Sequence, residues 1–305
     1  MYGVPQSQNG SGMEQIIANG LYLDAQDALM ALGLTLIFSL VNVLNFARGQ
    51  MFVFGGFVTY PVLAKFGLPF IVGLVASAVV LAATGAVAEV FLFRPVIRRS
   101  KRDESTMLLA ARVAFFLDAV ILLVFGEKQR GIPKIVSGVF NNAGVIMPYD
   151  RTLIGVLTVA LIAAFIAFMQ YSRTGRAMRA LDQDRRAAQV MGVDVDRYSM
   201  IGFALGAMLA GLVGGLLVAV TGINLGMGGP TSIKAFTMIM IGGAGVISGA
   251  IAGGFILGMM ESVGLTLLSA YRAKARTDDA AKRVGAGGLV AVQQRGCRCQ
   301  HGRHR

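Results

Sequence analysis

The sequence contains no tryptophan, little charge, and no cysteine or histidine before residue 297. Charged residues make up 14% of its 305 residues and hydrophobic residues 55%, whereas a soluble domain carries about a quarter charged residues. Several apolar runs approach the roughly 20 residues that a helix needs to cross a bilayer. The composition predicts an all-α fold, a polytopic transmembrane helical bundle, and disfavours a soluble domain.

The scarcity of histidine and cysteine also narrows the chemistry of the chain. No Ser/His/Asp set and no pair of carboxylates suggests catalysis. The sequence has no P-loop lysine motif, and the glycine-rich run 242–249 lacks the preceding strand that a dinucleotide-binding loop requires. We therefore expect neither enzymatic activity nor a cofactor in this chain.

The positive charge of the chain is unevenly distributed. The net charge is +12, of which +7 lies in residues 272–305. In the rest of the chain, basic residues cluster at 94–102 and 173–186, as expected of loops on the cytoplasmic side of a membrane. This distribution favours membrane lipid as the surroundings of the chain and disfavours nucleic acid as a partner.

The apolar segments predict about eight spans or part-spans. Residues 1–12 are a flexible lead-in without the features of a signal peptide. If both basic clusters are cytoplasmic, residues 127–151 lie outside, where turn residues favour a small hairpin or loop. Counting back from there puts Arg48 inside and the N-terminus outside. The segments are 28–45, 50–66, 70–93, 106–126, 151–171, 198–222, 234–247 and 249–270.

Glycines recur at four-residue spacing in the later apolar segments, as in Gly202 and Gly206, and Gly211 and Gly215. This spacing favours close packing of helices in a membrane. The segment near 242–249 is expected to be broken by its glycines. Unwound backbone at membrane depth is also tolerated where it lines a cavity, which is the alternative interpretation of this segment.

Each ionisable residue in the apolar segments has a structural interpretation beside a functional one. Glu89 is expected at the inner interface, close to the first basic cluster. Arg112 and Asp118 share one span and are expected to face the bundle interior or to pair with neighbours. Asp24 and Asp27 share a helical face and are expected to form an exposed acidic helix start; meeting the ammonium group of a solute is the alternative.

Residues 172–197 form a polar helical stretch between two apolar segments. Ala187 and Ala188 are small, and Gly192 follows four positions after Ala188. A short helix with small residues and a glycine stop is suited to docking into a groove of another protein, although a merely solvated loop is the alternative.

Three blocks of the sequence, in order, resemble the membrane permeases of ABC importers for branched-chain amino acids. They are residues 31–50, 174–193 and 231–262, the last with Lys-Ala-Phe-Thr from Lys234, Gly-Gly-x-Gly from Gly242, and a late Glu261. The resemblance covers about residues 13–271, which form the expected permease domain.

The resemblance implies the partners of the chain and the roles of its residues. Such permeases work with a second permease chain, two cytoplasmic ATPase subunits and an external solute-binding protein, in the bacterial inner membrane. The ATPase-coupling residues would be Arg186, Ala187, Ala188 and Gly192. The translocation path would include Asn42, Asn45, Lys234, Gly242, Gly243 and Gly245.

The chain departs from the family pattern at several positions. Arg186 replaces the usual leading acid of the coupling motif, and Arg48 and Gln50 replace a histidine and a glutamate. Residues 272–305 form an atypical basic tail in place of a final apolar helix. We expect that this tail results from a reading-frame shift. The metal-like set Cys297, Cys299, His301 and His304 lies in it and is disfavoured as a metal site.

The sequence thus predicts the permease subunit of an ATP-driven importer, for branched-chain amino acids or a related small polar solute such as an amide or urea. A stand-alone channel or ion-coupled transporter is the alternative, and a crippled, frameshifted permease is a further one. Buried, paired charges and no docking helix would favour the channel or transporter.

Overall fold

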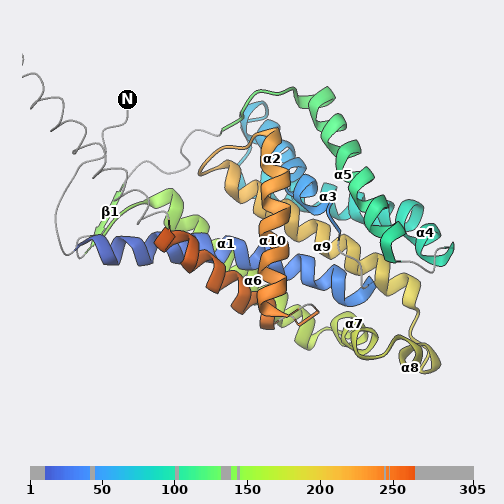
Figure 1. The fold of residues 1–305 in the computed structure, drawn as a ribbon. Coiled ribbons are helices and arrows are strands. Elements are labelled where there is room, and N and C mark those ends of the chain that lie inside the picture. Colours follow the sequence, from blue (N-terminus) through green and yellow to red (C-terminus); the bar gives the residue numbers. More distant parts are fainter. Residues whose placement is uncertain are drawn as a thin grey trace, which may run out of the picture. The chain divides into compact units, whose positions relative to one another are not determined.

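The structure, a computed structural model, describes residues 11–41, 45–99, 103–131, 139–142, 145–243, 245–246 and 248–264. This part of the chain is mostly helical (Figure 1). The chain divides into two units, 1–259 and 260–305, and the helices α1 to α10 and both strands belong to the first. Asn42 and the tail residues from 265 onward, with Cys297, Cys299, His301 and His304, lie outside the described residues.

The elements follow one another as a series of helices interrupted by one hairpin. The helices are α1 Ser11–Val41, α2 Arg48–Ala64, α3 Phe70–Ala88, α4 Arg94–Arg99, α5 Asp103–Phe125, α6 Tyr149–Tyr171, α7 Arg173–Gln183, α8 Arg185–Val190, α9 Val195–Val218 and α10 Gly228–Gly242. A π-helix, Glu89–Phe93, joins α3 to α4, and a short 3₁₀ helix, Leu225–Met227, precedes α10. Residues 248–264 are helical.

Four helices in the described part are long and apolar enough to cross a membrane: Phe70–Ile97, Ser105–Phe125, Tyr149–Tyr171 and Val195–Val218. Ala25–Leu40 is a shorter apolar helix. Strands β1 Val139–Asn142 and β2 Val145–Pro148 pair antiparallel. The hairpin agrees with the turn residues of 127–151, and it means that the fold is mostly helical rather than entirely so.

The centre of the core is α9, against which α1, α2 and α3 pack. Of an apolar 18-residue stretch of α9, 72% is buried in the structure, against 22% of the corresponding stretches of α5 and α6. Glycine makes this packing possible, because a Cβ at Gly214 would overlap the carbonyl oxygen of Phe52, and one at Gly55 would overlap the backbone of Gly211. The close packing predicted from glycine spacing is therefore present along α9.

The π-helix brings an ion pair to the junction of α3 and α4. Glu89 is 3% exposed, and its Oε2 accepts a hydrogen bond of 2.8 Å from Arg94 Nη2. Arg94 also donates to the backbone oxygen of Asp196 at the start of α9, at 2.9 Å. The pair therefore ties the end of one long helix to the beginning of another.

The chain breaks between α10 and the helix 248–264. Gly243 and Gly245 both have φ of 89°, which favours glycine because a side chain is strained there. On either side of the break the two helices touch through backbone: a Cβ at Gly242 would overlap Gly249, and one at Gly253 would overlap the carbonyl of Met238. The glycine-broken segment predicted near 242–249 is thus the turn of a tight helical hairpin.

Candidate translocation and coupling sites

Polar side chains gather where α2 begins, in the interior of the bundle. We call Asn45, Arg48, Gln50, Asp118 and Ser232 the polar cluster. Three come from the start of α2 and the residues just before it, and the other two from α5 and α10. Asn45 is 1% exposed, Gln50 and Ser232 are each 7% exposed, and Asp118 is half-buried. Such groups are expensive in an apolar bundle and point to function when they persist.

Arg48 is the most deeply buried cation of the described chain. It is 1% exposed, and its Nη2 donates to the carbonyl oxygen of Gly206 at 2.9 Å. Its Nε and Nη1 have no hydrogen-bond partner among the described residues. The guanidinium occupies the space beside Gly33, where any Cβ would overlap it. Arg48 is therefore buried against α1 and α9, and its position on the cytoplasmic side of the membrane stays a prediction.

Gln50 and Asp118 form a direct pair between α2 and α5. Gln50 Nε2 donates to Asp118 Oδ2 at 3.0 Å. The remaining oxygens, Gln50 Oε1 and Asp118 Oδ1, are buried and have no partner in the described part. The expectation that Asp118 pairs with a neighbour is confirmed. The same expectation for Arg112 is wrong, since Arg112 lies on the exposed face of α5.

Ser232 fastens α10 to the segment that leads into α2. Its hydroxyl accepts from Gly49 N at 3.1 Å and donates to the carbonyl oxygen of Phe46 at 3.2 Å. The rings of Phe46 and Phe236 pack with centroids 4.6 Å apart. Before α2, Asn45 Oδ1 accepts from Ala47 N at 3.0 Å. These bonds hold the backbone of α2's first turn in a fixed place.

Lys234, on the same stretch of α10, pairs with α1 instead. Its Nζ lies 2.7 Å from Asp27 Oδ2, and both side chains are mostly buried. The expectation that Asp27 belongs to an exposed acidic helix start was therefore wrong. Burial next to Lys234 explains the difference, because a carboxylate in an apolar bundle needs a cation beside it. Nothing is described of the side chain of Asp24.

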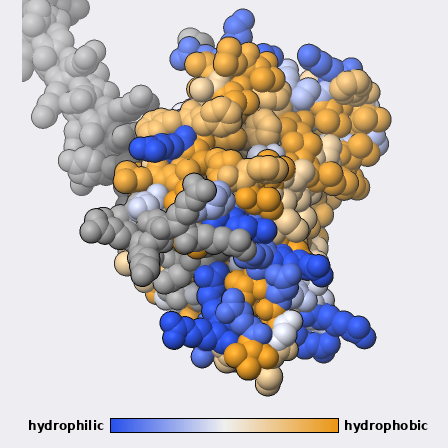
Figure 2. All heavy atoms as spheres, turned by 90° about the vertical axis from the view of Figure 1, so that its right-hand side faces the viewer, coloured by the Kyte–Doolittle hydropathy of each residue, from blue (hydrophilic) through white to orange (hydrophobic). Residues whose placement is uncertain are grey.

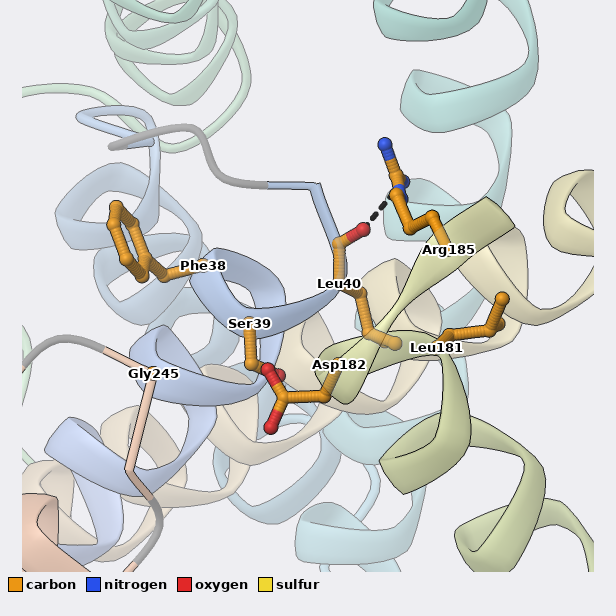
Figure 3. A pocket seen from close by; sticks show the side chains of 7 residues that line it. All are labelled: Phe38, Ser39, Leu40, Leu181, Asp182, Arg185 and Gly245. Carbon is orange, nitrogen blue, oxygen red and sulfur yellow. Dashed lines mark hydrogen bonds between the residues drawn. The ribbon is translucent and has the colours of Figure 1, made fainter. Parts of the chain in front are cut away.

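The residues predicted to line a path occupy two places. Asn45 lies in the polar cluster, and Lys234 is two residues from Ser232. Gly242, Gly243 and Gly245 instead form the turn of the hairpin. Gly245 borders a cavity of about 330 Å³, shown in Figure 3, which is lined by Phe38, Ser39, Leu40, Leu181, Asp182, Arg185 and Gly245.

This cavity joins the end of α1 to α7 and α8. In Figure 3 the Asp182 carboxylate points toward Ser39, and Arg185 donates through Nη2 to the carbonyl oxygen of Leu40. Burial raises the pKa of Asp182. Burial lowers the pKa of Arg185, and the nearby charge of Asp196 opposes that shift. Two oppositely charged groups thus stand at one junction between helices.

The α7–α8 surface, residues 173–192, is a polar pair of short helices at the lower right of Figure 1. Figure 2 shows hydrophilic side chains gathered at that end of the molecule and apolar ones above it. Ser172 caps α7 by accepting from Gly175 N at 2.9 Å. Asp184 caps α8 by accepting from Arg186 N at 2.8 Å. Both short helices therefore begin at a side-chain cap.

The predicted coupling residues divide between the two sides of α8. Ala188 is buried, 5% exposed, against the core. Arg186 and Ala187 are exposed. Gly192 ends the helix with φ of 85°.

Sequence reasoning missed the most exposed apolar residues of this surface, Val190 and Met191, at 88% and 86%. They are two adjacent apolar residues at the end of a polar stretch, and this pattern could have indicated an exposed contact site.

The described residues contain no group of three or more His, Cys, Asp or Glu able to hold a metal ion.

Residues 16–284 match the family described as branched-chain amino acid transport system / permease component. The chain belongs to this family. The resemblance drawn from its three sequence blocks is thereby confirmed, and with it the prediction of a transport permease.

Named relatives of this permease family match most of the chain. LivH, the high-affinity branched-chain amino acid transport system permease protein of Escherichia coli strain K12, is 31% identical over 84% of this chain and 87% of its own. BraD of Pseudomonas aeruginosa is 31% identical over 82% and 85%. A probable LivH of Methanocaldococcus jannaschii is 30% identical over 83% and 81%. No solved structure matches the chain.

Proposed function

We propose that the chain is the permease subunit of an ATP-driven importer of branched-chain amino acids. It crosses the bacterial inner membrane about eight times and forms part of the path for the solute. ATP hydrolysis takes place in separate subunits. Its family membership and the names of its relatives support the solute, and the apolar helices support the membrane location.

The observation that carries the proposal is the exposed apolar end of the α7–α8 surface. Val190, the last residue of α8, and Met191, which follows it, are 88% and 86% exposed, although α8 is held to the core through Ala188. A solvent-facing apolar pair on a fixed, capped helix suits a groove of a partner protein. The partner we assign to it is an ATPase subunit.

Movement of α8 would reach the membrane helices through two contacts. Arg185 at its start is bonded to the last turn of α1 through the carbonyl of Leu40. Asp182, at the end of α7, borders the same cavity as Gly245 in the hairpin turn. Closure of two ATPase subunits would therefore pull on α1 and on the hairpin together. A second permease chain and an external solute-binding protein complete the proposed assembly.

The decisive experiment replaces both exposed residues by aspartate, Val190→Asp with Met191→Asp, in cells that express the complete transporter. We expect the permease to reach the membrane at its normal level but to lose the co-purifying ATPase and leucine uptake, because two charges would enter an apolar groove. Phe66→Asp is the matched control, because Phe66 is also exposed, at 72%, but far along the chain from α8.

Normal ATPase association in the double variant would contradict the docking role. Leucine uptake by the wild-type chain without any ATPase would favour a stand-alone channel or ion-coupled transporter instead.

For residues 272–305 we propose the reading-frame shift inferred from their composition. Resequencing the gene tests it. An uninterrupted frame that encodes this tail, together with an active product, would contradict the proposal, whereas an inserted or deleted base near codon 271, whose correction restores an apolar helix, would support it.

A further inference from the structure

The Gln50–Asp118 pair has two acceptor oxygens that the described protein does not use. One bond joins the two side chains, from Gln50 Nε2 to Asp118 Oδ2 at 3.0 Å. Gln50 Oε1 and Asp118 Oδ1 are both buried and without a partner in the described part. Buried acceptors without donors are rare in folded proteins, so each such group calls for an explanation.

No cation of the described chain lies within ion-pair reach of Asp118. Arg48, two residues from Gln50, is directed elsewhere: successive positions on a helix are about 100° apart, so Arg48 and Gln50 point to nearly opposite sides. The contacts agree, since Arg48 lies against Gly33 and Gly206 while Gln50 lies against Asp118 and Gly228. A cation that pairs with Asp118 would therefore have to come from outside the described part of the chain.

The surroundings of the pair are partly closed. Asp118 is half-buried rather than enclosed. Gln50 lies against the backbone of Gly228, the first residue of α10, where a Cβ would overlap the amide. The 3₁₀ helix Leu225–Met227 leads directly into that residue. A glycine at this position leaves space for the Gln50 amide, and part of the Asp118 side chain is exposed although Oδ1 itself is buried.

We propose that Gln50 and Asp118 bind the ammonium group of the amino acid during its passage. A primary ammonium group has three N–H donors, so it can satisfy Gln50 Oε1 and Asp118 Oδ1 together and neutralise the carboxylate. A divalent cation would require about six oxygen ligands, and the pair offers two. The inference rests on the proposed function, because it assigns a recognition role within that importer.

The test measures binding to the purified complex of permease and ATPase subunits in nanodiscs, without the external solute-binding protein, by isothermal titration calorimetry. Three probes separate the functional groups of the solute: L-leucine, isoamylamine, which keeps the ammonium group but lacks the carboxylate, and isocaproate, which keeps the carboxylate but lacks the ammonium group. The main variant is Asp118→Asn, which removes the charge at nearly constant size. Glu127→Gln, the same chemical change at an exposed residue just after α5, is the matched control.

We expect Asp118→Asn to weaken the binding of leucine and isoamylamine about tenfold or more, and to leave isocaproate unchanged. Gln50→Met removes one acceptor without altering the charge and should weaken the binding of the same two probes about threefold. If Asp118→Asn does not insert into the membrane, the binding measured with Gln50→Met tests the proposal instead. Leucine binding by Asp118→Asn within about twofold of wild type would overturn the proposal. Equal weakening of all three probes, or no binding of isoamylamine to wild type, would also overturn it.

Leucine uptake by the wild-type transporter with its solute-binding protein, measured in proteoliposomes, separates this inference from the proposed function. If the wild-type transporter takes up leucine and Asp118→Asn binds leucine as tightly as wild type, the ammonium site is overturned and the proposed function stands. Absence of leucine uptake in the wild type overturns the function, while the isoamylamine titration still decides whether the pair binds ammonium groups.

Discussion

The polar cluster and the α7–α8 surface place side chains in opposite surroundings. In the polar cluster, charged and amide groups are buried among apolar helices, and several of their polar atoms have no partner in the described chain. On the α7–α8 surface, polar residues face outward and two apolar residues are exposed among them. Each region therefore carries groups that its own fold does not satisfy, which is typical of sites that meet another molecule.

The two regions also differ in how they are held. Backbone contacts between glycines fix the helices around the polar cluster, whereas side-chain caps and one arginine hold α7 and α8. A change in the first region should therefore disturb folding, and one in the second should disturb coupling while the fold persists. The following substitutions test that difference, from the largest expected effect to the smallest.

Gly214→Val should have the largest effect. Its Cβ would overlap the carbonyl oxygen of Phe52, and neither backbone can yield without separating α9 from α2. We expect a loss of more than about 4 kcal/mol of stability and little permease in the membrane, measured by immunoblot of the membrane fraction. Gly229→Val is the control, because a Cβ there meets nothing within 4 Å. Normal levels of the Gly214 variant would show that the glycine contacts are not required.

Arg185→Met should separate docking from transport. It removes the bond to the Leu40 carbonyl, the direct link between α8 and α1, but leaves Val190 and Met191 exposed. We expect normal ATPase co-purification with leucine uptake reduced about tenfold, equivalent to ~1.4 kcal/mol of coupling free energy. Arg197→Met is the control, since Arg197 is exposed and its contact with Asp194 spans 3.9 Å. Loss of the ATPase from the Arg185 variant would show that this residue supports docking itself.

Gly192→Ala should have a moderate, local effect. A Cβ at this position meets nothing, so the cost arises only from φ of 85° and amounts to about 1–2 kcal/mol. Because α8 ends here, we expect weaker ATPase association, measured by the fraction retained in a pull-down at increasing salt. Gly192→Asn should cost less than alanine, because asparagine adopts this conformation more readily. Equal retention for wild type and Gly192→Ala would indicate that α8 ends elsewhere in the assembled transporter.

Asp182→Asn should have the smallest effect, visible only in its pH dependence. Burial raises the pKa of Asp182 above its ordinary value, which is about 3.9. Below that ordinary value the carboxyl is protonated in both the folded and unfolded states. As pH rises, the unfolded state ionises first, so native stability falls until the raised folded pKa has been passed.

The asparagine variant lacks this loss. Its melting temperature should match that of wild type near the ordinary carboxyl pKa and exceed it slightly above the raised one. A difference that is constant with pH would contradict the proposed burial effect.

The sequence predicted the helices well because their signals are local. Apolar runs of suitable length, the broken segment at Gly243 and Gly245, and the hairpin before α6 each depend on a few neighbouring residues. It also predicted that Asp118 would pair. It misplaced Asp27 and Arg112, because which helix faces which is decided by contacts between residues far apart in the chain. The bond from Arg185 to Leu40 joins residues 145 positions apart and has no counterpart in any local pattern.

On the α7–α8 surface, too, the sequence could not predict which residues face outward. Small residues and a glycine stop marked Ala188 and Gly192, but the pattern could not tell which alanine would be buried. Ala188 is buried and holds the helix to the core, while Val190 and Met191 are the exposed residues that we propose to contact the partner. The side of a six-residue helix that faces outward depends on the helices beneath it, and these come from distant parts of the sequence.

The central position of α9 has a consequence for how the protein is made. The helices α1, α2 and α3 precede it in the chain, yet their small-residue faces pack against it. During synthesis these three helices leave the ribosome before residues 195–218 do. Until then the faces of α1, α2 and α3 that pack on α9 lack the surface that they fit. The bundle can therefore close around α9 only after that helix has been made.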